Sequence, residues 1–148
     1  MRIALYQPDQ AGNVGTILRL AACLAVPVDV IEPCGFPWGD KALKRAGMDY
    51  VEIVNVTRHA DWKGFISRLN GRLVLLTSRA ALRLDQATFQ PDDVLLLGSE
   101  SRGVPQAVHD EAGLKVRIPQ VAGTRSLNIA VAAGIGLAEA LRQTERLP

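Results

Sequence analysis

The sequence predicts an α/β fold, a mostly parallel sheet flanked by helices. Short apolar runs without polar alternation, such as residues 73–76 and 94–97, are typical of strands buried on both faces of a parallel sheet. Stretches with helical periodicity lie between these runs, as expected when strands and helices alternate. At 148 residues, of which 48% are hydrophobic, the chain is expected to form one domain over residues 1–148.

The remaining elements follow in order along the chain. The apolar runs predict six strands, at residues 3–6, 28–31, 51–54, 73–76, 94–97 and 114–118. Asn13 is expected to cap a first helix, because Val14, Ile17, Leu18 and Ala21 follow it at helical spacing. Further helices are predicted at residues 61–69 and 106–111, and Asp40 is a plausible cap for a short basic helix.

The C-terminal helix, at residues 129–141, is predicted from an unusual composition. It contains five alanines, two glycines and a single charge, Glu139. Such small residues allow neighbouring backbones to approach closely, and the absence of a wide polar face predicts a buried helix. The polar loop at residues 122–126 leads into it. A ligand site is expected where a loop runs through the protein interior between a strand and a helix.

Composition and targeting features restrict the class of protein. The net charge of +2 does not by itself indicate that the protein binds nucleic acid, so only local clusters of basic residues can indicate such binding. Cys23 and Cys34 lack a paired spacing and are interpreted as free thiols in a reducing compartment, with no metal. The N-terminus is a predicted strand and not a signal peptide, and the apolar stretch before Glu139 is shorter than the about 20 residues that span a bilayer. The protein is expected to be cytoplasmic.

Three loops follow the predicted fourth, fifth and sixth strands, at residues 77–79, at residues 98–105 and at the approach to Ser126. Ligands bind beyond the carboxyl ends of parallel strands, so these loops are candidate binding sites. Gly98 and Gly103 either serve turns or allow close backbone approach. Neither a dinucleotide fingerprint nor a phosphate loop occurs in the sequence.

The loops together carry a resemblance to a known family. Residues 13–19 (NVGTILR), residues 97–105 (LGSESRGVP) and the stretch from Ile118 to Asn128 are similar to the three motifs of the SPOUT RNA methyltransferases. Residues 36–50 (FPWGDKALKRAGMDY) resemble the motif of the TrmL-type tRNA 2′-O-methyltransferases.

This resemblance implies a homodimer whose C-terminal side forms a deep trefoil knot that holds S-adenosylmethionine. It implies 2′-O-methylation of the wobble ribose, of cytidine or carboxymethylaminomethyluridine, in leucine tRNA. Two alternatives stay open: a methyltransferase for another tRNA or rRNA site, and a non-catalytic module that binds RNA or a nucleotide. The sequence shows no separate RNA-binding domain beside the motifs, so the methyltransferase domain itself is expected to bind tRNA.

The resemblance also implies roles for individual residues. The cofactor-binding residues implied are Leu76, Thr77, Gly98, Glu100, Ile118, Ser126 and Leu127. Arg19, Asn13 and Ser126 are implied in catalysis, with Arg19 orienting the 2′-hydroxyl; the alternative is a surface arginine in a salt bridge. Asn13 either positions Arg19 or caps its helix. Ala130 departs from the family pattern, since many relatives carry serine there.

The expected RNA contacts are basic side chains near these loops, namely Lys41, Lys44, Arg45, Arg102 and Arg125. For the first three, a solvated basic helix is the alternative. Phe36 and Trp38 either stack on an unpaired base or cover the sheet edge. His59 and His109 are both expected at the surface.

Overall fold

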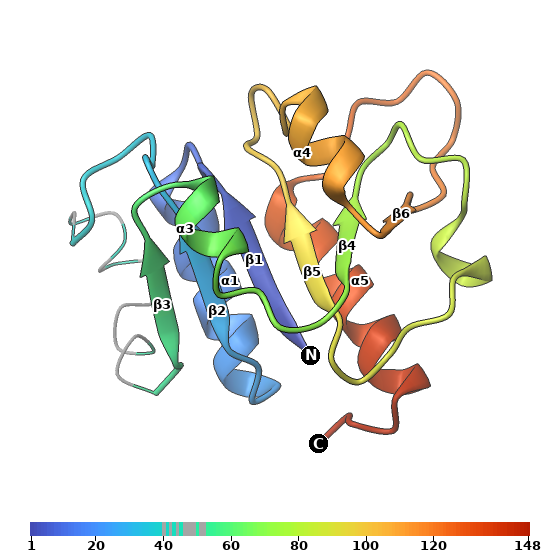
Figure 1. Cartoon of the computed structure of the whole chain (residues 1–148), viewed down its shortest axis with the longest axis horizontal. Helices are drawn as coiled ribbons and strands as arrows, with labels where there is room; N and C mark the ends of the chain where they lie inside the picture. The colour runs from blue at the N-terminus through green and yellow to red at the C-terminus, as the bar shows by residue number, and fades with distance from the viewer. Residues whose placement is uncertain (40, 42, 44, 46–49, 51–52) are drawn as a thin grey trace.

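The computed structural model describes residues 1–39, 41, 43, 45, 50 and 53–148, and these build a six-stranded parallel sheet with helices on both faces (Figure 1). The strand order is β3-β2-β1-β5-β4-β6, and every neighbouring pair is parallel. The strands are β1 (Arg2–Tyr6), β2 (Val28–Ile31), β3 (Val56–His59), β4 (Leu73–Leu76), β5 (Val94–Leu97) and β6 (Leu114–Val116). The predicted fold class is therefore confirmed.

Two helical layers bury the two faces of the sheet. Helices α1 (Ala11–Cys23) and α5 (Ile129–Gln143) pack against each other behind the sheet, and α3 (Trp62–Ile66) and α4 (Gln106–Glu111) lie in front of it in Figure 1. Alternate residues of one strand enter opposite cores. Leu95 and Leu97 join the core under α1 and α5, whereas Leu96 joins the core with Phe65 of α3. This double burial explains why β4 and β5 are continuous apolar runs.

The third strand was predicted at the wrong place. Residues 51 and 52 lie outside the described residues, and Ile53, with 69% of its surface exposed, and Val54 belong to a turn and bend. The strand instead begins at Val56. Because β3 is an edge strand that pairs only with β2, three of its four residues are at least partly exposed, and its sequence is not an apolar run.

Several helix predictions also need correction. Helix α1 begins at Ala11 after Gln10, so Asn13 lies within the first turn and is not its cap. Asp61 does cap α3, accepting a hydrogen bond from the Gly64 amide at 2.7 Å, but α3 ends at Ile66. The expected cap Asp40 lies outside the described residues.

The C-terminal helix is only half buried in the single chain. Its inner face packs on α1 and on β5, and Gly136 lies so close to Leu76 that a Cβ atom would come within 2.7 Å of that side chain. The outer face exposes Val131 (49%) and Ile135 (40%). The prediction of a buried helix therefore holds for the inner face of α5 and is wrong for its outer face in one chain, since no other element of the described chain covers that face.

One histidine prediction was wrong as well. His59 is 5% exposed, and its Nε2 lies 2.7 Å from Oδ1 of buried Asp29, whose Oδ2 accepts from Arg2. A buried carboxylate needs such partners, and the pairing crosses three strands, which no local pattern encodes. His109 is half buried in α4.

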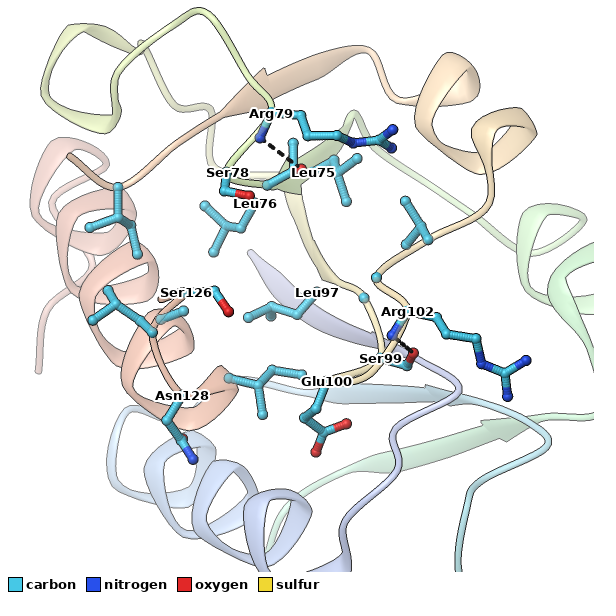
Figure 2. Close-up of a pocket in the computed structure, with 18 of the residues that line it drawn as sticks. Leu75, Leu76, Ser78, Arg79, Leu97, Ser99, Glu100, Arg102, Ser126 and Asn128 are labelled. Atoms are coloured by element: carbon cyan, nitrogen blue, oxygen red, sulfur yellow. Dashed lines mark hydrogen bonds between the residues drawn. The ribbon is translucent and has the colours of Figure 1, made fainter. Parts of the chain in front are cut away.

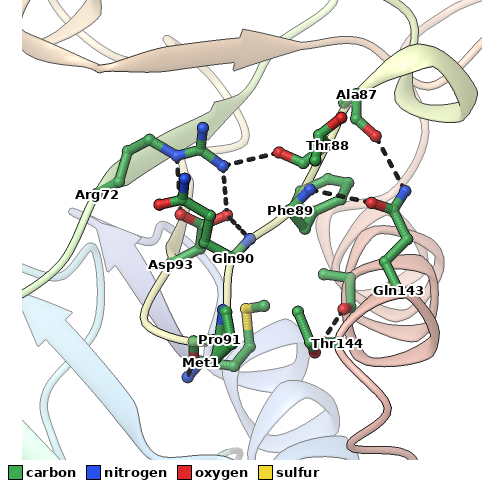
Figure 3. Close-up of polar contacts among 11 residues, drawn as sticks. Met1, Arg72, Ala87, Thr88, Phe89, Gln90, Pro91, Asp93, Gln143 and Thr144 are labelled. Atoms are coloured by element: carbon green, nitrogen blue, oxygen red, sulfur yellow. Dashed lines mark hydrogen bonds and ion pairs between the residues drawn. The ribbon is translucent and has the colours of Figure 1, made fainter.

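Polar contacts fasten the segment between β4 and β5 at the amino end of the sheet (Figure 3). Arg72 donates to both carboxylate oxygens of fully buried Asp93 at 2.8 and 2.7 Å, and this carboxylate raises the pKa of Arg72. Gln143 of α5 donates to the Ala87 carbonyl at 2.9 Å and accepts from the Phe89 amide at 3.0 Å. The C-terminal helix is thereby tied to a loop that precedes it by about 55 residues.

No helix among residues 1–39 and 53–148 is long and apolar enough to cross a membrane.

Candidate functional site

A cavity of about 650 Å³, here called the first cavity, opens at the carboxyl ends of β4 and β5 (Figure 2). The three loops expected to hold a ligand all contribute to its wall, together with the start of α1. Every residue predicted to bind a cofactor lines this cavity: Leu76, Thr77, Gly98, Glu100, Ile118, Ser126 and Leu127. The sheet thus brings together residues that are up to 51 positions apart in sequence, from Leu76 to Leu127.

The turn after β5 requires glycine at its first position. Ser99 and Gly103 exchange two backbone hydrogen bonds, of 3.0 and 2.8 Å, which folds the chain back on itself. A Cβ atom on Gly98 would lie 2.5 Å from the carbonyl carbon of Gly103, a distance at which atoms overlap. Gly103 has a φ of +65°, which favours glycine. The close-approach interpretation of Gly98 therefore holds, and the backbone of this turn faces the cavity.

A chain of hydrogen bonds beside the first cavity joins the loop after β1 and the start of α1 to the turn after β5 and the start of α5. Asn13 donates from Nδ2 to Glu100 Oε1 at 2.9 Å, and the Asp9 amide donates to Glu100 Oε2 at 2.7 Å. Asn128 donates from Nδ2 to Asn13 Oδ1 at 3.0 Å. Asn128 also caps α5, because its Oδ1 accepts from the amide of Ala130 at 2.8 Å. The position of α5 is thereby coupled to the loops after β1 and β5.

The lining of the first cavity is divided between apolar and polar groups. Leu76, Leu97, Ile118 and Leu127 provide apolar surface, and Figure 2 shows Glu100 and Asn128 at the side nearest α1. A cavity with apolar walls and a few convergent polar groups suits a small molecule with a flat apolar part and a polar part.

Arg19 is not brought to this cavity. Its side chain is exposed on α1, its guanidinium carbon lies 5.8 Å from the centre of the Tyr50 ring, and it is absent from the described residues that line the first cavity. Asn13 and Ser126, the other two residues implied in catalysis, do line it. Within one chain, the three implied catalytic residues do not meet.

Of the described residues predicted to contact RNA, only Arg102 lines the first cavity. Arg102 lines the cavity, and Figure 2 shows its side chain pointing away from the centre. Arg125 lies in the exposed loop before α5. Lys41 and Arg45 are exposed, whereas Lys44 lies outside the described residues.

The aromatic side chains of the Phe36 loop pack against the protein. Phe36 and Trp38 are both half buried against the core, and the Arg58 guanidinium lies 5.0 Å from the Trp38 ring centre. Arg58 also forms an ion pair with Glu32. These contacts favour the interpretation that this loop covers the sheet edge.

Sequence reasoning missed several residues of the site. Gln10 lines the first cavity, and nothing in the sequence pointed to it. Arg79 lies in the loop at residues 77–79 that was expected to hold a ligand, but its side chain was given no role. Asp9 was missed entirely. Its Oδ2 accepts from the Ser101 amide at 2.8 Å and from the Ser101 hydroxyl at 2.6 Å, and these bonds lower the pKa of Asp9. Across the described ranges, no group of three or more His, Cys, Asp and Glu side chains is placed to hold a metal ion.

Comparisons with known proteins place these observations in a family. A model of the SpoU rRNA Methylase family matches residues 1–138. The chain is 50% identical over 148 residues to a tRNA (cytidine(34)-2′-O)-methyltransferase of Beijerinckia indica, covering 98% of this chain and 92% of the relative. A solved structure that concerns the 2-OH methylation of C/U34 on tRNA superimposes with a TM-score of 0.91 at 38% identity, covering 96% of this chain and 94% of the other.

A second solved structure is informative about ligands. An AdoMet-bound rRNA methyltransferase of Sinorhizobium meliloti superimposes with a TM-score of 0.85 at 30% identity, over 95% of this chain and 55% of that protein.

Proposed function

Because the chain belongs to the SpoU rRNA methylase family, we propose that it transfers a methyl group from S-adenosylmethionine to the wobble ribose of tRNA. The methyl acceptor is the 2′-oxygen of cytidine or carboxymethylaminomethyluridine at position 34, and the substrate is leucine tRNA. The three motifs, which resemble those of the SPOUT methyltransferases, are consistent with membership of this family. One observation supports the proposal most strongly: the seven residues implied in cofactor binding line one cavity.

The first cavity fits S-adenosylmethionine in size and chemistry. Its volume of about 650 Å³ lies within the roughly 300–1,000 Å³ of small-molecule sites. The side chains of Leu76, Ile118 and Leu127 suit an adenine ring, and the turn after Gly98 forms part of the cavity wall, where its backbone groups can meet the ligand. When bound, the cofactor supplies an electrophilic methyl group on a sulfonium.

The residues of the chain position the acceptor and the loops around it. Both carboxylate oxygens of Glu100 already accept hydrogen bonds, from Asp9 and Asn13, so Glu100 holds the site together and is not the base. The Ser126 hydroxyl lies at the cavity wall, where it is available to a ligand. Arg19 is proposed to orient the 2′-hydroxyl and the adjacent phosphate, since a guanidinium binds such oxygens in a bidentate manner and stabilises the developing alkoxide. The phosphate aids proton removal.

A homodimer reconciles the position of Arg19 with this role. Arg19 does not line the cavity of its own chain, and it lies on α1, the helix that packs against α5, whose outer face exposes Val131 and Ile135. Pairing of two copies through this face covers the apolar side chains. We propose that Arg19 then acts at the cavity of the second copy.

We also propose that the C-terminal segment forms a trefoil knot and that residues 1–148 form one domain. Arg117, between β6 and the C-terminal segment, donates its amide to the Leu82 carbonyl at 2.9 Å and accepts from the Leu84 amide at 2.8 Å. The C-terminal segment therefore starts against the loop between β4 and β5, and Gln143 of α5 contacts that same loop further along. These contacts support a C-terminal segment threaded past this loop. Residues 1–148 then act as one methyltransferase domain in the cytoplasm, where tRNA is used.

The proposal is tested by mapping methyl transfer. The purified protein is incubated with labelled S-adenosylmethionine and bulk tRNA from a strain that lacks wobble ribose methylation, and the labelled nucleotide is identified. Label at the wobble ribose of leucine tRNA, lost in Arg19→Ala, is expected. Label elsewhere in tRNA or in rRNA overturns the proposed substrate, and cofactor binding without transfer to any RNA overturns the proposed activity.

A further inference from the structure

A second cavity of about 350 Å³ lies beside the first, at the carboxyl end of β1. The two cavities share residues of the turn after β5, namely Ser99, Arg102, Gly103 and Val104, here called the shared wall. The other residues of the second cavity come from the end of β1 and the loops after β1 and β2: Tyr6, Gln7, Asp9, Pro33, Cys34 and Gly35, with Pro105 beyond the shared wall.

The sheet topology makes this position a preferred one for a ligand. From β1 the chain proceeds through β2 to β3 on one side, and β5 and β4 lie on the other side of β1. The order of strands therefore reverses between β1 and β5. In open parallel sheets, ligands bind in the crevice outside the strands at such a reversal. The second cavity lies at this point, and the methyl donor is assigned to the neighbouring first cavity.

The shared wall is thin, because it is a turn closed on itself. Ser99 and Gly103 are held by two backbone hydrogen bonds, and there is no space for a side chain on Gly98. A molecule in the second cavity is thus separated from the first cavity by little more than one layer of backbone. A nucleotide that spans the rim of this wall can place one part in each cavity.

The second cavity offers an ionised acceptor at a fixed position. The Oδ2 atom of Asp9 is held by the Ser101 amide and hydroxyl, which lower the pKa of this carboxyl and keep it charged at neutral pH. Within the described part of the chain, Asp9 Oδ1 accepts no hydrogen bond. Gln7 adds an amide whose Nε2 lies 3.5 Å from the Glu32 carbonyl, at the limit of a hydrogen bond.

The remaining walls suit the faces of a base. Burial raises the pKa of the Cys34 thiol to about 11, so it is neutral and serves as soft apolar surface. Tyr6 and Val104 are half buried and add apolar atoms. Arg102, on the shared wall, is exposed and supplies a positive charge at the rim for a phosphate.

We propose that the second cavity binds the unpaired base of the nucleotide whose ribose is methylated, with Asp9 Oδ1 accepting a hydrogen bond from its Watson–Crick edge. This inference rests on the proposed function. Both pyrimidines present a suitable donor: the N4 amino group in cytosine, which carboxylates accept from in nucleic-acid recognition, and the N3–H group in uracil. Holding the base in the second cavity brings its ribose to the rim of the first.

The kinetic test compares two RNA substrates for methylation. Two anticodon stem-loops carry either cytosine or no base on an intact ribose at position 34, and kcat/KM is measured for each. The wild-type protein is expected to prefer the cytosine substrate by about tenfold or more, as for a hydrogen bond to a charged group. Asp9→Asn is expected to lower kcat/KM for the cytosine substrate and to leave the abasic one unchanged. Equal losses on both substrates, or no wild-type preference, overturn the proposal.

Two matched variants separate base recognition from loop positioning. Ser101→Ala removes the hydroxyl that donates to Asp9 and keeps the carboxylate, so the preference for cytosine is expected to persist. If Ser101→Ala abolishes the preference as Asp9→Asn does, the effect is on the loop and the proposal is wrong. Asp92→Asn makes the same charge change at an exposed residue just before β5. This residue lies at the amino ends of the strands, away from the cavities, so the preference is expected to stay intact.

A binding readout decides the matter independently of turnover. In a Cys23→Ser background, Cys34 is the remaining thiol, and its alkylation by iodoacetamide is measured at pH 9 because its pKa is high. The cytosine stem-loop is expected to slow alkylation, and the abasic stem-loop is not. Equal rates with both RNAs overturn the assignment of the cavity. If the wild-type protein methylates a different nucleotide, the proposed function fails, and the same comparison with that nucleotide's base still tests the cavity.

Discussion

Asn128 donates a hydrogen bond of 3.0 Å to Asn13, across 115 positions of sequence, at the N-termini of α5 and α1. Through Asn13 the same chain of contacts reaches Glu100 in the turn after β5. Three segments that contribute to the first cavity are thus held by one small amide side chain.

Replacement of this amide is expected to loosen the cofactor site. Asn13→Ala leaves Glu100 Oε1 and Asn128 Nδ2 without their partner, at a cost of about 1–3 kcal/mol for each group that is not rehydrated. We expect S-adenosylmethionine to bind at least about tenfold more weakly in isothermal titration calorimetry. Asn70→Ala, which removes an exposed amide far from the cavity, serves as the control. Wild-type affinity in Asn13→Ala would show that the network does not shape the site.

The turn after β5 is expected to tolerate no side chain at its first position. In Gly98→Ala, the new Cβ atom would lie 2.5 Å from the Gly103 carbonyl carbon, so the turn must open. Overpacking of this kind costs about 1–3 kcal/mol, and cofactor binding is expected to be lost with it. Calorimetry of cofactor binding and thermal unfolding check this. Gly12→Ala is the control, because no atom other than its chain neighbours and its own helix backbone lies within 4 Å of its Cβ position, and its unfolding temperature is expected to be unchanged or raised.

Arg19 is expected to contribute to transfer and not to cofactor binding. Arg19→Ala should lower kcat by about 100-fold or more, as when a group that stabilises a developing charge is removed. Calorimetry should show unchanged affinity for S-adenosylmethionine, since Arg19 does not line the first cavity. A large loss of cofactor affinity would contradict this assignment.

Complementation then tests whether Arg19 acts across the proposed dimer. Arg19→Ala and Gly98→Ala chains are each expected to be inactive. After joint unfolding and refolding in equal amounts, half of the dimers contain one chain of each kind. Each of these has one intact cavity facing one intact Arg19, so about a quarter of wild-type activity is expected. No recovery, with mixed dimers verified by mass spectrometry, would show that Arg19 acts within its own chain.

The tie between α5 and the loop after β4 is expected to stabilise the fold. Gln143 donates to the Ala87 carbonyl and accepts from the Phe89 amide, as Figure 3 shows. Loss of both contacts in Gln143→Ala should reduce the free energy of unfolding by about 1–3 kcal/mol. Urea denaturation measures this change. Gln86→Ala removes an exposed amide from the same loop and should change stability by less than about 0.5 kcal/mol.

Which elements could be predicted depended on how they are buried. The central strands β1, β2, β4 and β5 were predicted close to their observed positions, because burial on both faces makes their sequences mostly apolar. The edge strand β6, with the sequence LKV, was also predicted at its observed place, although it is only partly buried. The edge strand β3 was misplaced, since Thr57 and Arg58 do not need to be apolar there. Helix α5 was recognised from its composition, but its exposed face was not, because no local pattern distinguishes a helix covered by its own chain from one that is half covered.

The sequence by itself determined the fold class and pointed, through its motifs, to seven of the residues that line the first cavity, because strand and helix periods and motif residues are local properties of the chain. Only the tertiary structure decided how these residues are joined. Asn13 looked like a helix cap and instead bonds to Glu100, 87 positions away, while Asp9 bonds to Ser101 and His59 to Asp29. Such hydrogen bonds depend on which strands become neighbours in the sheet. Strand order is set by the packing of the whole chain and is not encoded near any one residue.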